Sequence, residues 1–447
     1  MRTRFVKLPV IGLSMIGLSL FSSLTFAFEV NEARGREIIS FSSPNYQNEI
    51  CLLPNHSGQS AYSEADVKIE QELCHFDLYG QTPNMQRVAV CPKIKSTNPG
   101  MHLLLDHATS AFPDRSLNCG IRDESLNLVA KHKQSISCSY TPSILMYYHL
   151  SRRLGNILNI PVAVVRTIDK SEHQKWTTQA LSFFDPKNNE LIHQNWQHYQ
   201  RAHQTPQKYP QIFTEDAKFL YGALLLNAGG EQYYGEVNGK GDYATRELRF
   251  QKQPPFLQVA SEKSIDVINT GLNFKQRLQN VVQMKDLADM ILMDQLLNQA
   301  DRVGNIHYFE SYFRLEGDQV ARTEGPAPDA VLIKEMTLRD NDCGIIKENR
   351  FKAFKILEKV RHMDPKTYHH FLTWVRELNS PETIDFLRHE VLLTSKDLND
   401  PNSGLIANAK ALSKLLITNC RSGYLKLDVS IETFDRPYRF DPAQCEP

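Results

Sequence analysis

The sequence DQLLNQADRVGNIHYF, residues 294–309, lies at the end of the longest helical pattern in the chain. Apolar residues recur at steps of three and four over 274–299, which predicts a long helix with a broad buried face. One strand is predicted over 308–315 and a second over 330–338, which leads into LRDNDCGI at residues 338–345. We expect a hairpin whose two ends place both flanking loops in one cleft.

These two loops carry the side chains that phosphoryl transfer requires. One carboxylate must orient or deprotonate the acceptor hydroxyl, while an amide and a second carboxylate hold the metal ion that bridges the nucleotide phosphates. Asp301 is the predicted catalytic residue, and Asn305 and Asp340 are the predicted metal ligands. Asp342 is either an alternative ligand or an acid of the turn. Asp301 could instead be a helix-ending acid whose charge pairs with its neighbours.

Upstream of these loops, the pattern is strand, helix, strand. LNLVAKHK at 126–133 has strand composition, residues 142–154 have the apolar spacing of a helix, and residues 160–168 form a β-branched strand. The apolar run 220–226 fits a strand or a short helix, and its periodicity does not decide between them. Helical patterns return over 350–420.

Phosphoryl transfer also needs a strand lysine that reaches the phosphates as a point charge. Lys131 in LNLVAKHK is the first choice and Lys133 the second. Arg166, on the later strand, is a further candidate to line a phosphate pocket. These three residues are the predicted nucleotide-binding set.

DQLLNQADRVGNIHYF and LRDNDCGI resemble the catalytic and metal loops of the atypical kinase-like families. These families include the secretory-pathway casein kinase of the Golgi, the CotH spore-coat kinases, HipA and the phosphoinositide kinases. SYTPSILMYYHLSRRLGNILNIPVAVVRT, residues 139–167, also resembles their small-lobe helix, Leu-Gly turn and Pro-led strand. The resemblance covers roughly residues 100–420, and the motif itself about twenty residues.

The resemblance implies a two-lobed, kinase-like α+β fold, with a β-rich small lobe at 101–245 and a mostly helical large lobe at 246–447. It also implies ATP or another nucleotide and Mg²⁺ or Mn²⁺ as cofactors. The implied reaction is phosphoryl transfer to a hydroxyl of an unknown protein, lipid or sugar. Residues 28–100 are loop-rich and hold three cysteines, which predicts a disulfide-stapled N-terminal extension.

Three features differ from the kinase pattern. Asn305 lies four residues after Asp301, whereas protein kinases place this amide five residues after the acid. The helix after LNLVAKHK holds no glutamate, so the lysine needs another carboxylate as its partner, or Lys133 is the lysine. No clear glycine-rich loop precedes Lys131. A non-catalytic kinase-like binding protein and a nucleotidyl or glutamyl transferase on the same scaffold therefore remain open.

The N-terminus predicts export. A basic start with Arg2, Arg4 and Lys7 precedes an apolar run over 8–20, and residues 25–27, Thr-Phe-Ala, place small residues where a signal peptidase cleaves. Residues 1–27 are therefore predicted to be a cleaved signal peptide, with an uncut N-terminal anchor as the alternative. The run is shorter than the ~20 apolar residues that a bilayer span needs, and no later stretch approaches that length. We expect an exported protein, periplasmic or secreted, without a stable membrane span.

All eight cysteines lie beyond the predicted signal, and an even number in an exported chain predicts disulfides. The early cysteines, from Cys51 to Cys138, are expected to pair largely among themselves. Cys343, beside the predicted metal loop, is expected to be disulfide-bonded and not a nucleophile. The full connectivity is left open, because eight cysteines allow many pairings.

Composition limits the class of partner. The 51 Lys and Arg residues balance 51 Asp and Glu residues, so the chain offers no net field to a polyanion and nucleic acid is not an expected partner. Hydrophobic residues make up 41% of the chain and charged residues 23%, which excludes wholesale disorder. The 447 residues are enough for two or three domains or one large two-lobed enzyme.

Overall fold

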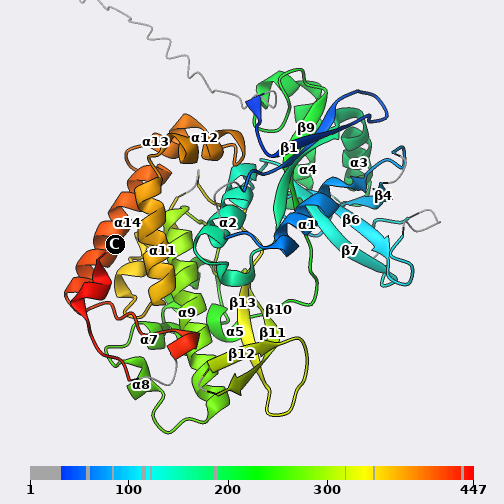
Figure 1. Ribbon diagram of the computed structural model, residues 1–447. Helices are drawn as coiled ribbons and strands as arrows, with labels where there is room; N and C mark the ends of the chain where they lie inside the picture. The colour runs from blue at the N-terminus through cyan, green and yellow to red at the C-terminus, as the bar shows by residue number, and fades with distance from the viewer. Residues whose placement is uncertain are drawn as a thin grey trace, which may run out of the picture.

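The protein is described here by a computed structural model. It describes residues 32–446 with the exception of 57–60, 83–84, 112–116, 121–122, 186, 188–189, 318, 346–347 and 434–436. The predicted signal peptide, 1–27, lies outside the described residues. Figure 1 shows a β-rich part built from the N-terminal half of the chain and a mostly helical part built from the C-terminal half. The predicted two-lobed α+β class is confirmed.

A seven-stranded antiparallel sheet forms the β-rich part, with the strand order β1-β2-β8-β9-β7-β6-β5. Its strands are β1 (Glu37–Phe41), β2 (Glu49–Leu53), β5 (Ala89–Pro92), β6 (Met101–Asp106), β7 (Leu126–Lys133), β8 (Ala163–Asp169) and β9 (Phe219–Leu226). The strands predicted at 126–133 and 160–168 are confirmed, and 220–226 is a strand. Strands β8 and β9 are buried at nearly every position, which requires cover on both faces of the sheet.

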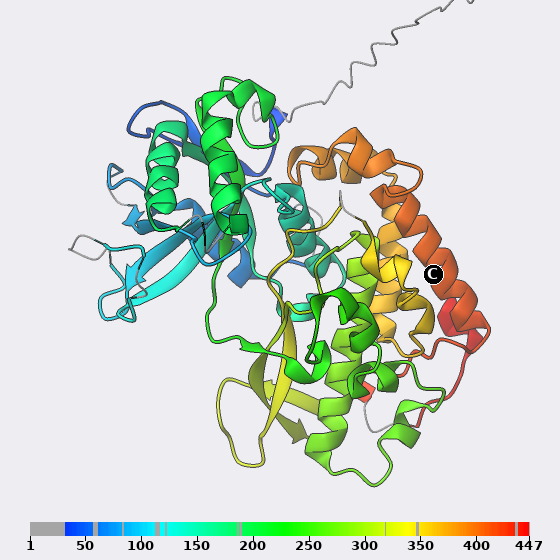
Figure 2. The same ribbon diagram turned by 180° about the vertical axis from the view of Figure 1, so that it is seen from behind.

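Four helices supply that cover. They are α1 (Glu64–Cys74), α2 (Thr141–Arg153), α3 (Lys170–Ser182) and α4 (Glu190–Gln204). Helices α1 and α2 pack against β8 and β9, while α3 packs against the same strands and carries α4 beside it. Figures 1 and 2 show α1 on one face of the sheet and the α3–α4 pair on the other. Helix α2 begins with Pro142 in its first turn, where a missing N–H costs nothing.

Described residues of the segment 28–100 form part of this sheet. The segment contributes β1, β2 and β5, and its helix α1 packs against β2, β8 and β9. The small strands β3 (Phe76–Asp77) and β4 (Gln86–Arg87) form a separate parallel pair. The structure therefore places the described residues of the predicted extension inside the β-rich part.

The helical part is organised around α9 (Phe274–Leu296), which agrees with the helix predicted over 274–299. The helix begins with a capping box, because Asn273 accepts from the Gln276 N–H and the Gln276 side chain accepts from the Asn273 N–H. Strand β13 (Val331–Leu338) packs against α9. It pairs with β11 (Ile306–Glu316) in a second sheet that also contains β10 (Gln232–Tyr233) and β12 (Gln319–Thr323). The predicted hairpin strands correspond to β11 and β13.

The other helices of this part are shorter than α9. They are α5 (Gly235–Asn238), α6 (Arg246–Phe250), α7 (Pro254–Val259), α8 (Ile265–Ile268), α10 (Arg350–Ala353), α11 (Pro365–Glu377), α12 (Pro381–His389), α13 (Ser395–Asn399) and α14 (Leu405–Arg421). One continuous hydrophobic core includes residues from both parts of the molecule. The chain passes to the second sheet at β10, before the predicted boundary at residue 245. Within the described part of the chain, no helix combines the length and hydropathy of a membrane span.

Four disulfides account for all eight cysteines. Cys51–Cys74 and Cys91–Cys119 lie within the β-rich part, and Cys420–Cys445 joins the end of α14 to the C-terminal segment. Cys138–Cys343 connects the two parts of the molecule. The early cysteines therefore pair largely among themselves, as predicted, and Cys343 is disulfide-bonded.

Candidate functional site

The two predicted loops lie side by side at one end of the β11–β13 hairpin. Ile306, the first residue of β11, pairs with Leu338, the last residue of β13. The loop before β11 and the loop after β13 therefore leave the hairpin together. They also touch, because the Ala300 N–H donates to the Cys343 carbonyl over 2.9 Å. This is the contact that the predicted hairpin requires.

Asn298 and Gly344 allow the two loops to approach each other this closely. Asn298 turns the chain out of α9 in the left-handed region, at a φ of 52°, and its side-chain amide donates to the carbonyls of Ile345 and Ser403 at 3.2 and 2.7 Å. A Cβ on Gly344 would lie 2.5 Å from the Ser143 hydroxyl oxygen on α2. The second loop therefore packs against α2 at a distance that only glycine permits.

A buried ion pair fixes the first loop to its surroundings. The Arg302 guanidinium donates to both carboxylate oxygens of Asp294, at 2.8 and 3.0 Å, and to the Asn341 side-chain oxygen at 2.7 Å. The Tyr147 hydroxyl of α2 donates to the same aspartate at 2.5 Å. Burial raises the pKa of Asp294, and the Arg302 charge counteracts that rise. This network ties α2, α9 and both loops together, and the sequence analysis missed Asp294 and Tyr147 as its members.

Lys133 connects the β-rich sheet to the second loop. Its Nζ donates to Asp342 Oδ2 at 2.9 Å and to Asp340 Oδ1 at 3.3 Å. Lys133 and Asp342 are buried, whereas 43% of the Asp340 side chain is exposed. Burial opposes the charge of Lys133, but Asp342 and Asp340 outweigh it and raise its pKa. The lysine charge in turn holds the pKa of Asp340 below its usual range. The loop thus supplies the carboxylate partner that the helix lacks.

Two further lysines lie beside this group. Lys131 precedes Lys133 by two residues in β7 and so shares its face of the sheet. Burial, followed by the Lys133 charge, lowers the pKa of Lys131. The same two causes lower the pKa of Lys93, directly after β5, to about 8. His102 pairs with Lys131 across the ladder, and burial together with these lysines lowers its pKa to about 3. Lys93 escaped the sequence analysis because it lies within the predicted extension.

Asp301 lies on the more exposed side of the first loop, with 33% of its side chain exposed. The Asn305 amide donates to the Asp301 carbonyl at 2.8 Å and to its carboxylate at 3.3 Å. The Tyr243 hydroxyl donates to Asp301 Oδ1 at 2.9 Å, and the Arg246 guanidinium pairs with the same oxygen. The structure therefore brings the predicted residues Asp301 and Asn305 together. Tyr243 and Arg246 were missed because they lie more than fifty residues upstream.

Arg166 is not brought into this arrangement. Its guanidinium donates to Glu49 at 2.9 and 3.2 Å and to the carbonyls of Cys74 and Phe76, both at 3.2 Å. The side chain is buried, and its guanidinium lies 4.1 Å from the centre of the Phe41 ring. Arg166 therefore holds β2 and the end of α1 against β8, and these contacts occupy its hydrogen-bonding groups. This position differs from the phosphate-pocket role predicted for it.

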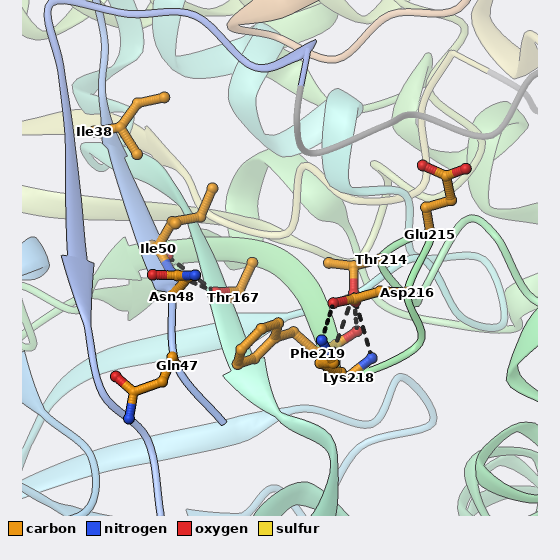
Figure 3. A pocket seen from close by; sticks show the side chains of 10 residues that line it. All are labelled: Ile38, Gln47, Asn48, Ile50, Thr167, Thr214, Glu215, Asp216, Lys218 and Phe219. Carbon is orange, nitrogen blue, oxygen red and sulfur yellow. Dashed lines mark hydrogen bonds and ion pairs between the residues drawn. The ribbon is translucent and has the colours of Figure 1, made fainter. Parts of the chain in front are cut away.

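A separate pocket of about 560 Å³ opens near β1, β2 and the start of β9 (Figure 3). It is lined by Ile38, Gln47, Asn48, Ile50, Thr167, Thr214, Glu215, Asp216, Lys218 and Phe219. Within it, the Thr214 hydroxyl and the Lys218 N–H both donate to the Asp216 carboxylate. This lining contains none of the predicted site residues that the structure describes, so we assign no function to the pocket.

Comparisons with known proteins add little to this site. No protein-family model matches the sequence, and no curated protein matches it. Among solved structures, the fold is similar to one described as the crystal structure of the golgi casein kinase, at a TM-score of 0.38 and 11% sequence identity. That similarity covers 87% of this chain and 83% of the other.

Proposed function

We propose that this protein is a nucleotide- and divalent-metal-dependent phosphotransferase that moves a phosphoryl group to a hydroxyl of a protein, lipid or sugar. One observation carries the proposal. The strand lysine Lys133 contacts Asp340 and Asp342 on a loop that is hydrogen-bonded to the loop of Asp301. Phosphoryl transfer depends mainly on positioning and on charge stabilisation. It uses a lysine to contact the phosphates, a carboxylate to hold the metal ion and a second carboxylate to orient the acceptor hydroxyl.

The lysines supply the positive charge for the phosphates. Lys93 and Lys131 have lowered pKa values, caused by burial and by the charge of Lys133. Like charges that lie close together disfavour protonation, and a polyanion bound among them removes that penalty. The three lysines are therefore suited to a polyphosphate, with Lys133 nearest to the loop acids.

Asp340 is the residue best suited to hold the metal ion, with Asp342 beside it. Within the described residues, no group of three or more His, Cys, Asp and Glu side chains is arranged to bind a metal. A nucleotide-bound Mg²⁺ needs only one or two protein carboxylates, because phosphates and water complete its ligands. The partly exposed carboxylate of Asp340 fits that set. When bound, such an ion would neutralise phosphate charge.

Asp301 and Asn305 form the acceptor side of the site. The Asp301 carboxylate is partly exposed and already accepts a hydroxyl hydrogen bond, so it can orient or deprotonate a hydroxyl that approaches it. The Asn305 amide nitrogen is turned to Asp301, which leaves its amide oxygen to assist the metal ion.

The disulfides indicate an oxidising extracellular or lumenal environment. We propose that the protein is exported and, since little ATP is present outside the cytoplasm, delivered to a nucleotide-rich compartment such as a host cell. Full function in an ATP-free periplasm would contradict this route.

A non-catalytic, kinase-like binding protein is the second candidate. It is favoured by two features of the sequence, the four-residue spacing from Asp301 to Asn305 and the absence of a glutamate from the helix that follows Lys133. Such a protein should keep its binding phenotype when Asp340 is replaced by alanine. Nucleotidyl or glutamyl transfer on the same residues would differ in the products released from the nucleotide, which product analysis distinguishes.

The decisive experiment is a thermal-shift measurement on the oxidised chain with ATP, in the presence and absence of Mg²⁺ or Mn²⁺. We expect metal-dependent stabilisation of about 2.7 kcal/mol at a ligand concentration one hundred times the dissociation constant. Asp340→Ala should lose this stabilisation. Asp216→Ala, an acid of the separate pocket, is the matched control and should retain it. The absence of a shift in all three proteins would refute nucleotide binding.

A further inference from the structure

The hydroxyl of Tyr243 lies where an acceptor hydroxyl must lie. It donates to Asp301 Oδ1 over 2.9 Å. A general base has to be within about 2.6–3.2 Å of the hydroxyl oxygen whose proton it takes, and this contact meets that requirement. Tyr243 belongs to a short 3-10 helix, Tyr243–Thr245, that lies outside both predicted loops.

The ring is held in this position from two sides. The Arg246 guanidinium lies 3.9 Å from the centre of the Tyr243 ring and pairs with the same Asp301 oxygen. The turn before it is fixed as well, because the Asp242 side chain accepts from the Ala244 N–H and its carbonyl accepts from Arg249. The hydroxyl is therefore directed at the carboxylate by packing and by charge.

The ring also remains open to solvent. Tyr243 is 67% exposed, which is the largest value among the exposed large hydrophobic residues of the described chain. Ala300, which precedes Asp301 in the chain, donates its N–H to Cys343 on the loop whose acids contact Lys133. The Tyr243 hydroxyl is therefore bonded to a loop that directly contacts the loop proposed to hold the nucleotide.

We propose that Tyr243 is an intramolecular acceptor, and that the protein phosphorylates its own Tyr243 hydroxyl. This inference rests on the phosphotransferase function proposed above. In the reaction, the phenolic proton passes to the Asp301 carboxylate and the phenolic oxygen bonds to the γ-phosphorus. The bond between that phosphorus and the bridging oxygen breaks, and the nucleoside diphosphate leaves.

The titration behaviour of Tyr243 agrees with a need for a base. Although the ring is largely exposed, partial burial of this tyrosine, followed by its hydrogen bond to Asp301, raises its pKa above the usual value. The hydroxyl therefore keeps its proton at neutral pH, so attack on phosphorus requires a neighbouring carboxylate to accept it.

The test is to incubate the oxidised full chain with ATP and Mg²⁺ or Mn²⁺ and to map phosphorylated peptides by mass spectrometry. We expect phosphate on Tyr243. The fraction of chains labelled per unit time should not change with protein concentration. Tyr243→Phe should abolish this modification, and Asp301→Asn should slow it by about a hundredfold or more. Tyr233→Phe is the matched control, since Tyr233 is also exposed, at 50%, and should leave the labelling of Tyr243 unchanged.

Three results would overturn the inference, and they can be told apart. If the chain shows metal-dependent ATP binding and phosphorylates an added acceptor but carries no phosphate on Tyr243, the self-modification is wrong and the phosphotransferase function stands. If ATP gives no thermal shift and no acceptor is labelled, the phosphotransferase function fails and takes the inference with it. Labelling of Tyr243 that rises with protein concentration would also contradict an intramolecular reaction.

Discussion

The two sides of the candidate site are built in different ways. On the nucleotide side, Lys133 lies on an inner strand of a seven-stranded sheet, and it and its partner Asp342 are 3% and 2% exposed. On the acceptor side, Asp301 is one-third exposed and its partners Tyr243 and Arg246 come from short helical turns. Buried charges depend on their partners, whereas partly exposed pairs contribute little to stability. The nucleotide side should therefore support the fold, and the acceptor side should be free to change.

Removal of Lys133 is the strongest test of this difference between the two sides of the site. We expect Lys133→Met to lower the free energy of unfolding by about 3–5 kcal/mol, because it leaves the buried carboxylate of Asp342 without its partner. Chemical denaturation of the oxidised chain measures this change. Lys175, which is 70% exposed and pairs with Glu172, offers a matched lysine, and Lys175→Met should leave the unfolding free energy unchanged. Equal effects of the two substitutions would show that the Lys133 pair is not structural.

A smaller effect concerns nucleotide affinity and pH. The pKa of Lys93 is lowered to about 8 by burial and by the Lys133 charge, so Lys93 loses its proton as the pH rises through that value. Because phosphate binds the protonated lysine, affinity for ATP with Mg²⁺ should be highest below pH 8. Above it we expect a fall of at most about tenfold per pH unit from one proton. Titration calorimetry from pH 7 to 9.5 measures this slope.

Lys93→Met should weaken binding at pH 7 and flatten the slope. Lys95→Met, two residues away at an exposed position, should preserve both the affinity and the slope. An unchanged slope in Lys93→Met would mean that another group sets the pH dependence of binding.

The same contrast shows what the sequence could predict. The strand 126–133, the helix near 274–299 and the hairpin strands carry long regular patterns, and the structure confirms them. Strands β1, β2 and β5 have only four or five residues each, and turn-forming residues surround them. The sequence of 28–100 therefore predicted loops and not strands of the sheet. Their positions are fixed by pairing with distant strands, which local periodicity does not report.

The site was predictable to the extent that its residues share a motif. Asp301 with Asn305, and Asp340 with Asp342, are neighbours in sequence, and the structure brings Lys133 to the second pair. The other partners come from far along the chain, so spacing could not reveal them. They are Lys93, Tyr147, Tyr243 and Arg246. Asp294 lies within the motif itself, eight residues before Arg302, and was predicted only as part of the long helix. Arg166 was predicted to line a phosphate pocket from its position on a strand. Its guanidinium instead pairs with Glu49, which lies more than one hundred residues away in the sequence.

The smallest expected effect is on the stability of the acceptor side. Asp301→Asn should change the free energy of unfolding by less than about 1 kcal/mol, because the pair it weakens is partly exposed. Arg246 would keep a partner, since its guanidinium also pairs with Glu247, whose carboxylate binds Arg350 as well. Asp342→Asn is the matched substitution on the nucleotide side, and there we expect a clearly larger loss, since it weakens the buried pair with Lys133.

Measured by the same denaturation, these two isosteric changes isolate the effect of one negative charge on each side of the site. Phosphoryl transfer should nevertheless fall by about a hundredfold or more in Asp301→Asn, because the proposed general base has been removed. A variant that remains folded and binds ATP but transfers no phosphate would place catalysis on the side that contributes least to stability. If Asp301→Asn instead unfolds the protein as readily as Asp342→Asn, the acceptor side is structural and the division between the two sides is wrong.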